Sequence, residues 1–338
     1  MKNIRRTQPH SIRHLALLGA AIACVLSLAG CGLQPATAFV PAVAPGSIKN
    51  IDNLPPGASI TITSKNYTEA LILGKMAVLA AKAAGFKVTD KSNVPGSVAV
   101  RNLMLNGGAD MVWDYTGTAW LTYLGHKAGI PDPAKQYAAV RDEDKDNGLT
   151  WLAPAELDNT YAMAVRSGAV SKLNGITSLS QIKDLPVKER TFCVESEFNS
   201  RPDGFKPMLK TYGLTLGAAN GVPLSNVKIL DTGTVYEATA RGLCNFGEVF
   251  TTDGRILSLN LKVMKDDKSF FPAYNVAPVL RTATLEKYPQ LKSIFGQISS
   301  KLTNDEQQKL NLKVDVDGQE PADVAFNWMK AEGLISSP

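Results

Sequence analysis

Apolar and polar residues alternate between strand-like and helix-like patterns from residue 59 onward. Residues 59–63 read SITIT, a β-branched run typical of a strand. Residues 70–85, ALILGKMAVLAAKAAG, have helical periodicity and end on a glycine, the usual residue after a helix C-terminus. Asn66 and Glu69, just before this run, have the spacing of a capping box. The first ordered unit is therefore a predicted strand followed by a helix.

The same alternation continues through two stretches of the chain. In the first, we expect a strand at 86–89, a helix at 97–106 and a strand at 109–115. In the second, we expect strands at 161–166, 191–195, 227–230 and 246–251, with helices at 178–185, 204–212 and 235–241. A further capping box at 303–306 and a helix at 321–332 complete the chain. This order predicts α/β architecture with mostly parallel sheets, and the length favours two lobes over one core.

The N-terminus has the pattern of an exported protein. Residues 1–30 contain four basic residues and no acidic ones, and they end in the apolar run LALLGAAIACVLSLAG at residues 15–30. This run is shorter than the roughly 20 residues of a membrane-spanning helix, so residues 1–30 are a predicted signal peptide. Residues 28–31, LAGC, resemble a bacterial lipobox, which implies cleavage before Cys31 and a lipid on its sulfur. An ordinary signal peptide with an unrelated cysteine is the alternative.

Residues 31–57 follow the expected cleavage site. Residues 32–57 contain five prolines and lack apolar periodicity. We predict a flexible linker that holds the folded part roughly 25–30 Å from the membrane.

The charge of the mature chain differs from that of the full sequence. Removing the four basic residues of the signal peptide from 36 Lys and Arg leaves 32, against 31 Asp and Glu. A net charge of about +1 gives no electrostatic reason to expect nucleic acid as a partner.

Cys24 leaves with the signal peptide and Cys31 carries the lipid, so Cys193 and Cys244 are the two cysteines left to pair. In an oxidising compartment, a disulfide between them is the favoured interpretation, with free buried thiols as the alternative. Two sulfurs without a nearby histidine make a poor zinc site, and we expect no metal or other cofactor.

Most catalytic patterns are missing from the mature sequence. His126 is its single histidine, so there is no multi-histidine metal site and one candidate base for a nucleophile. The sequence has no GxSxG, no GxxxxGK[ST], and no GxGxxG after a strand. The acidic stretch 142–148 imitates a calcium loop, but its glycine is one place late and Ala153 replaces the bidentate glutamate. The sequence therefore indicates a binding protein and not an enzyme.

Six short segments resemble one family in consistent order from about residue 58 to residue 335. They are SKNYTE at 64–69, DYTGT at 114–118, NTYA at 159–162, RPDG at 201–204, TTDGRI at 251–256, and VAxxW at 324–328 with GLI at 333–335. Together they resemble the substrate-binding lipoproteins of osmoprotectant ABC importers, which bind glycine betaine, choline or related quaternary amines.

The resemblance implies the two-lobed fold of type II periplasmic binding proteins. Each lobe has a mixed sheet flanked by helices, and two hinge crossings join the lobes, which close on the ligand. Carried onto this sequence, lobe one is residues 58–158 plus 276–338, and lobe two is residues 159–275.

The resemblance also implies a set of ligand-binding residues. A quaternary ammonium has no N–H to donate, so it is recognised by the negative faces of aromatic rings. By resemblance, the cage positions are Tyr115, Tyr161, Phe250 and Tyr274. Tyrosine is more usual in this family at the position of Phe250. Phenylalanine keeps the π-face but lacks the hydroxyl.

Three further residues are the predicted partners of a ligand carboxylate, namely Lys65, Thr118 and Arg201. Lys65 and Arg201 come from different lobes, so a carboxylate that binds both would favour closure. A salt bridge within its own loop is the alternative role for Arg201. Trp113, Trp120 and Tyr123 are interpreted as residues that pack lobe one.

These inferences predict an extracytoplasmic, membrane-anchored solute-binding component of an ABC importer. Its partners would be a small quaternary amine, a permease and an ATPase, and not nucleic acid. One alternative is a similar receptor for a non-quaternary solute such as an amino acid. The alternative from a different class is a lipid-anchored hydrolase, which the single histidine disfavours.

Overall fold

The computed structural model describes residues 40–130 and 132–338. The expected signal peptide and Cys31 lie outside the described residues. Among the residues that are described, no helix combines the length and the apolar character needed to cross a bilayer.

The first lobe is built on a five-stranded sheet with strand order β3-β2-β4-β11-β5. Its strands are β2 (Ser59–Lys65), β3 (Lys87–Val94), β4 (Met111–Tyr115), β5 (Leu149–Trp151) and β11 (Val276–Arg281). β2 runs parallel to β3 and β4, whereas β11 is antiparallel to β4 and β5. β11 lies far from the others in sequence, so the chain returns to this sheet after building the second lobe.

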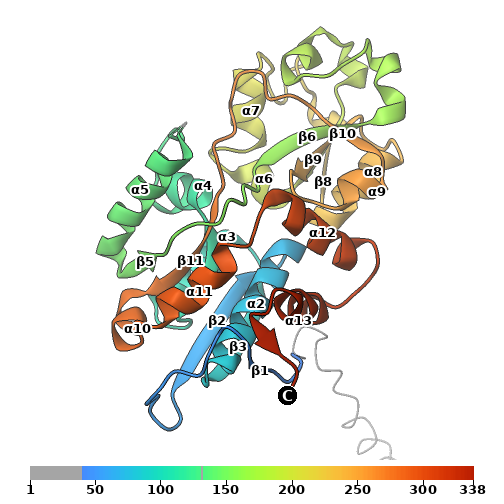
Figure 1. The fold of residues 1–338 in the computed structure, drawn as a ribbon. Helices are drawn as coiled ribbons and strands as arrows, with labels where there is room; N and C mark the ends of the chain where they lie inside the picture. The colour runs from blue at the N-terminus through green and yellow to red at the C-terminus, as the bar shows by residue number, and fades with distance from the viewer. Residues whose placement is uncertain (1–39, 131) are drawn as a thin grey trace, which may run out of the picture. The chain divides into compact units, whose positions relative to one another are not determined.

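Helices cover both faces of the first sheet (Figure 1). α2 (Thr68–Ala83) packs against β2 and β3 and is contacted by α11 (Leu291–Ser299), α12 (Asn304–Asp315) and α13 (Pro321–Ala331). α3 (Ser97–Leu105) and α5 (Pro133–Glu143) contribute to a second apolar cluster with β4, β5 and β11. The short α4 (Thr116–Thr118) continues into a π-helical turn at Ala119–Tyr123, and α10 (Thr282–Lys287) follows β11. Because α2 is surrounded, thirteen of its sixteen residues are buried.

The second lobe has a five-stranded sheet with the order β10-β6-β9-β7-β8. Its strands are β6 (Tyr161–Arg166), β7 (Phe192–Glu195), β8 (Val227–Leu230), β9 (Phe246–Phe250) and β10 (Leu261–Val263). Its α-helices are α6 (Ser196–Ser200), α7 (Phe205–Thr211), α8 (Thr232–Ala240) and α9 (Arg255–Ser258), and the segment expected as a helix at 178–185 is a 3-10 helix at Leu179–Asp184.

The two sheets are mixed, so the fold class of two α/β lobes with a mixed sheet in each is confirmed. The expectation of mostly parallel sheets from strand–helix alternation is wrong. In the second lobe β6 is antiparallel to both β9 and β10, and in the first lobe β11 is antiparallel to its neighbours. Strand–helix alternation in the sequence indicates how consecutive elements are connected. The antiparallel strands instead join their sheets after long excursions of the chain.

The interpretation of the whole segment 31–57 as a flexible linker is wrong for its described part. β1 (Ala44–Pro45) pairs with β12 (Ile335–Ser336) at the C-terminus. Ile48 is fully buried, and its N–H donates to the carbonyl of Leu334 at 3.0 Å. Prolines are tolerated here because the pairing is short, and a buried isoleucine supplies apolar contact that the proline count does not reveal.

The capping box expected at Asn66 and Glu69 is also wrong. Tyr67 is the residue before α2, and no side chain caps this helix. Glu69 turns inward instead and is buried, where it accepts hydrogen bonds from other segments. At the start of α12, by contrast, the Thr303 side chain accepts from the Glu306 N–H at 3.3 Å.

Cys193 and Cys244 form a disulfide that joins β7 to the residues before β9. Both residues are buried, beside Val235 and Ala238 of α8. The bridge therefore ties β7 to the connection between α8 and β9.

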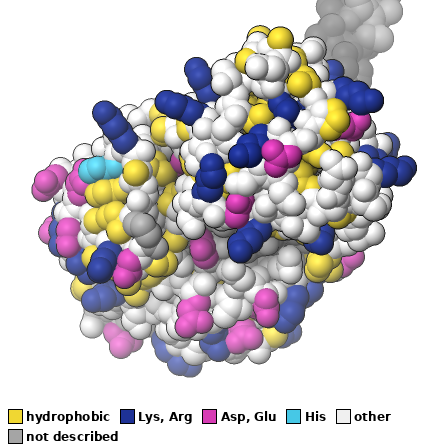
Figure 2. All heavy atoms as spheres, turned by 90° about the horizontal axis from the view of Figure 1, so that it is seen from above, with side chains coloured by type: hydrophobic (Ala, Val, Ile, Leu, Met, Phe, Trp, Pro, Cys, Tyr) yellow, Lys and Arg dark blue, Asp and Glu magenta, His cyan; other side chains and the backbone are white. Residues whose placement is uncertain are grey.

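Basic and acidic side chains are interspersed over the face of the molecule shown in Figure 2. This distribution agrees with the near-neutral charge that the sequence gives for the mature chain.

Two crossing segments connect the sheets, and they lie beside each other. The first leads from β5 to β6, and the second leads from β10 to β11. Their backbones bond where the N–H of Val276 donates to the Leu157 carbonyl at 3.2 Å. The Tyr274 N–H also donates to Oδ1 of Asp158 at 2.6 Å. Burial raises the pKa of the Asp158 carboxyl from 3.8 to about 6.

We predict that Asp158→Asn makes stability less sensitive to pH. A carboxyl with a raised pKa in the folded chain binds more protons folded than unfolded, so its contribution to stability falls as pH rises from about 4 through 6. Asparagine keeps Oδ1 for Tyr274 but carries no charge. The free energy of unfolding of the variant minus that of the wild type should therefore rise by about 1–3 kcal/mol from pH 4 to pH 7. Urea unfolding at both pH values measures this difference, and an equal difference at both would contradict the prediction.

Candidate functional site

A cavity of about 540 Å³ is lined by residues of both sheets and of the crossing segments. All seven residues predicted to bind the ligand line this cavity: Lys65, Tyr115, Thr118, Tyr161, Arg201, Phe250 and Tyr274. They come from the ends of strands β2, β4, β6 and β9, the α4 turn, the end of α6 and the second crossing. In open α/β sheets, ligands bind at such strand ends. Their roles in binding stay predictions, but the structure brings them together.

The aromatic residues of the cavity form a connected group of rings. The centroid of Tyr161 lies 5.2 Å from that of Phe250 and 5.6 Å from that of Tyr274, with the second pair perpendicular. Perpendicular and offset rings leave negative faces available toward a shared space. Burial raises the pKa of the Tyr161 and Tyr115 phenols well above the usual value, so both rings are neutral.

Tyr67 is an aromatic residue of this group that the sequence reasoning missed. Its ring stacks on Phe250 at 5.3 Å and lies 6.2 Å from Tyr115. It also lines the cavity. Its position in the sequence could have identified it, because Tyr67 lies two residues after Lys65 in the segment SKNYTE, which already carried a predicted ligand residue.

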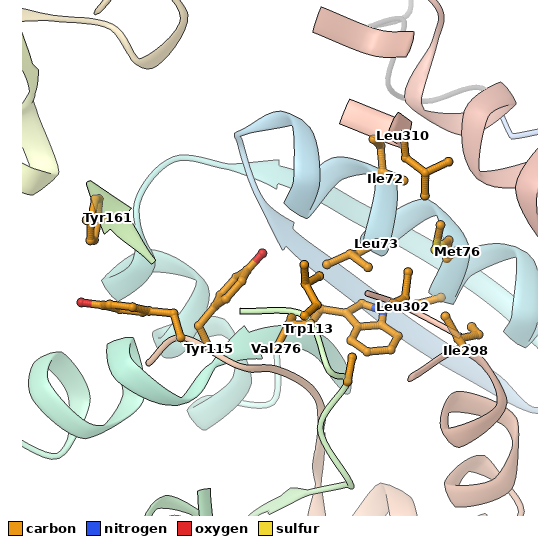
Figure 3. Packing of buried hydrophobic residues seen from close by; sticks show 14 of the residues in the cluster. Ile72, Leu73, Met76, Trp113, Tyr115, Tyr161, Val276, Ile298, Leu302 and Leu310 are labelled. Atoms are coloured by element: carbon orange, nitrogen blue, oxygen red, sulfur yellow. The ribbon is translucent and has the colours of Figure 1, made fainter. Parts of the chain in front are cut away.

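Tyr115 and Trp113 lie on the same face of β4 but belong to different surroundings. Trp113 is almost fully buried with Leu73 and Leu302, whereas Tyr115 lies on the side of Tyr161 (Figure 3). Residues i and i+2 of a strand share a face and are separated along it by two residues. The end of the strand therefore carries Tyr115 to the cavity while Trp113 packs in the core.

Gly117 lets the turn after β4 contact the second crossing. A Cβ at this position would lie 2.6 Å from two ring carbons of Tyr274 and 2.9 Å from the Ala273 carbonyl oxygen. The absence of a side chain thus allows Tyr274 to pack against the turn that carries Thr118.

Lys65 is paired with a protein carboxylate. Its Nζ lies 2.8 Å from Oδ1 of Asp114, and both side chains are about 95% buried, with exposed fractions of 4% and 5%. Nζ also lies 4.9 Å from the centroid of Tyr115. Asp114 additionally accepts a hydrogen bond from the Tyr123 hydroxyl at 3.0 Å. Lys65, which is predicted to bind a ligand carboxylate, is therefore already paired with Asp114 of the same lobe.

Arg201 is paired as well. Its Nε and Nη2 donate to Asp203 at 2.8 and 2.7 Å, a bidentate arrangement. Nη1 donates to Glu197 at 3.2 Å, and the guanidinium carbon lies 5.3 Å from the centroid of Tyr161. The loop salt bridge considered as an alternative is present, and Arg201 also lines the cavity.

Glu69 is a buried carboxylate directly behind the rings. Its Oε1 accepts from the hydroxyl of Tyr115 at 2.7 Å and from Nδ2 of Asn159 at 3.0 Å. Its Oε2 accepts from the hydroxyl of Thr252 at 2.6 Å and from Nδ2 of Asn311 at 3.3 Å. Burial raises the pKa of Glu69, and these four hydrogen bonds oppose that rise. The carboxylate thus holds Tyr115, a predicted cage ring, together with the first crossing, the second lobe and α12 at one point.

Comparison with protein families gives a match over most of the chain. The model described as "Substrate binding domain of ABC-type glycine betaine transport system" matches residues 58–331. A glycine-betaine-binding protein of Pseudomonas aeruginosa is 33% identical over 285 residues, which cover 82% of this chain and 89% of that protein. The carnitine transport binding protein OpuCC of Listeria monocytogenes is 31% identical over 251 residues, covering 73% and 77%.

Solved structures show the same fold. The crystal structure of a glycine betaine/carnitine/choline ABC transporter protein matches with a TM-score of 0.65 at 29% identity. The match covers 80% of this chain and 98% of that one. The apo form of YehZ from Escherichia coli matches with a TM-score of 0.61 at 26% identity, over 82% and 100% of the two chains. The architecture is that of type II periplasmic binding proteins.

We predict that Glu69→Gln destabilises the fold by about 1–3 kcal/mol. The amide that replaces one carboxylate oxygen is itself a donor, so it faces side chains that donate to Glu69 in the wild type. Urea unfolding at pH 7 measures the loss. Glu306→Gln is the matched control, because Glu306 accepts from Trp328 Nε1 at 3.0 Å and glutamine keeps one acceptor there. A loss no larger than that of the control would contradict the assignment of Glu69 as a structural anchor.

Proposed function

This chain belongs to the family of substrate-binding domains of ABC-type glycine betaine transport systems, and we propose that it captures a glycine betaine-like quaternary amine in the cavity between its lobes. The observation that carries the proposal is the composition of that cavity. Four predicted cage rings and Tyr67 line it together with Lys65 and Arg201. Rings recognise the ammonium end, and cations recognise a carboxylate end.

The aromatic rings suit a cation that cannot donate a hydrogen bond. Each cation–π contact contributes about 0.5–2 kcal/mol. Four rings then supply roughly 2–8 kcal/mol, whereas micromolar binding needs about 8 kcal/mol after ordering costs. The rings alone are marginal for a small solute, so a carboxylate that bonds to Lys65, Thr118 or Arg201 adds what tighter binding requires. Phe250 supplies a π-face at its position without a hydroxyl.

Closure of the two lobes completes the site in this proposal. Lobe one is residues 58–158 plus 276–338, and lobe two is residues 159–275. The paired crossings near Asp158 and Tyr274 support this division, because few backbone segments connect the sheets there. Lys65 belongs to lobe one and Arg201 to lobe two, so a ligand that contacts both stabilises the closed arrangement.

The transport context supplies the remaining partners. We propose that residues 1–30 direct export, that Cys31 carries a lipid, and that the mature chain works on the outer side of the cell membrane. A permease and an ATPase receive the solute, and the chain itself performs no catalysis. The match to a transport family supports this context.

Titration calorimetry with quaternary amines and with isosteres that lack the positive charge tests the proposal. We expect glycine betaine or choline to bind at least tenfold more tightly than 3,3-dimethylbutanoate or 3,3-dimethylbutanol, in which carbon replaces the ammonium nitrogen. The isosteres have almost the same shape, so the difference measures attraction between the positive charge and the rings. Tighter binding of glycine than of glycine betaine would favour the amino-acid alternative, and no heat with any quaternary amine would overturn the proposal.

We further predict that Tyr161→Leu weakens binding of the quaternary amine by about 2- to 30-fold, the value of one cation–π contact. The isostere without the ammonium charge should lose less affinity, because leucine keeps apolar contact. Tyr137→Leu is the control, since Tyr137 lies on α5 and packs against the apolar cluster of lobe one. Equal weakening of the charged ligand and of its isostere would argue against Tyr161 as a cage ring.

A further inference from the structure

The carboxylate of Glu197 bonds across the cavity from lobe two to lobe one. Glu197 lies in the first turn of α6, immediately after β7. Its Oε1 accepts from the Ser97 hydroxyl at 2.6 Å, and its Oε2 accepts from the Ser97 N–H at 3.3 Å. Ser97 is the first residue of α3, where backbone N–H groups are unsatisfied within the helix and favour an anion. Both residues line the cavity.

The same carboxylate faces the two cations predicted to bind the ligand. Asp203 takes Nε and Nη2 of Arg201, and Glu197 accepts from the remaining Nη1 at 3.2 Å. Burial opposes ionisation of Glu197, but the charge of Lys65, the Ser97 hydrogen bonds and Arg201 together hold its pKa below the usual value. Glu197 is therefore an anion placed between Lys65, Arg201 and the start of α3.

We propose that Glu197 is a specificity-determining residue that occupies the place of the ligand carboxylate before the ligand binds. This inference rests on the proposed function. Its side chain lines the cavity and is 30% exposed, so a ligand can reach it. A zwitterion such as glycine betaine must displace it to reach Arg201. A cation without a carboxylate, such as choline, leaves Glu197 in place and gains from its negative charge.

Glu195 is a suitable comparison because it is another carboxylate of the same cavity. Its Oε2 accepts from the N–H of Glu197 at 2.7 Å and from the N–H of Phe198 at 3.3 Å, which caps α6. Glutamine at position 195 removes a charge and keeps an acceptor for the cap. Glu195→Gln thus measures how far any lost negative charge alters the preference between a zwitterion and a cation.

The test is the affinity of the mature chain for glycine betaine and for choline in wild type, Glu197→Gln and Glu195→Gln, measured by titration calorimetry. We expect Glu197→Gln to tighten glycine betaine by about ten- to hundredfold, the value of a charge-assisted hydrogen bond no longer displaced. Choline should be unchanged or weaker. The ratio of the two dissociation constants must shift more in Glu197→Gln than in Glu195→Gln. Equal shifts in the two variants, or weaker binding of glycine betaine by Glu197→Gln, would overturn the proposal.

A second variant covers the case in which Glu197→Gln does not fold. Ser97→Ala removes the hydroxyl that bonds the carboxylate and keeps every charge, so it should tighten glycine betaine by a smaller factor. A crystal structure of the wild type with glycine betaine gives an independent readout. Glu197 should no longer accept from Arg201 Nη1, and retention of that bond beside the bound ligand would refute displacement. If the wild type binds neither ligand, the proposed function itself is wrong.

Discussion

The hydrogen bonds to Glu69 join segments of the chain that build the cavity and the region between the two sheets. A carboxylate buried at the start of α2 is costly unless its oxygens are satisfied, and here the donors come from four distant segments. One donor, Tyr115, is a predicted cage ring. Another, Asn159, lies on the first crossing, and Thr252 follows β9 of the second sheet. The position of a ring in the cavity is therefore set by the same group that fixes the region where the lobes join.

Both cations of the cavity that are predicted to bind the ligand are paired with protein carboxylates. Lys65 is paired with Asp114, and Arg201 with Asp203 and Glu197. Buried pairs of this kind contribute little net stability, because the cost of removing both charges from water offsets their attraction. Under the proposed function their consequence is selectivity instead, because a solute that exchanges contacts with these groups gains according to its own charge distribution.

The aromatic rings impose a different condition on the ligand. Their faces attract positive charge and offer no strong acceptor, so they suit a methylated ammonium better than one that carries N–H groups. The ring of Tyr67 extends this group on the side of Phe250. Since Phe250 lacks a hydroxyl, its own contribution is confined to the face of its ring. Rings and paired charges lie side by side in the cavity, with Lys65 over Tyr115 and Arg201 over Tyr161.

Local periodicity in the sequence was enough to predict the α/β class and most strands and helices, whereas the seven cavity residues came from the resemblance of short motifs to a known family. Residues 97–106, for example, were expected as a helix, and α3 spans Ser97–Leu105. It could not determine strand direction in the sheets, since β11 joins the first lobe only after the chain has built the second.

Only the tertiary structure decided what each polar residue faces. Glu69 had the spacing of a helix cap, yet buried donors from other segments bind its carboxylate more completely than one helix terminus could. Ser97 and Glu197 are 100 residues apart, and no local pattern connects them. Hydrogen bonds between distant segments depend on how the lobes are assembled, which is why local patterns identified the motifs but not their partners.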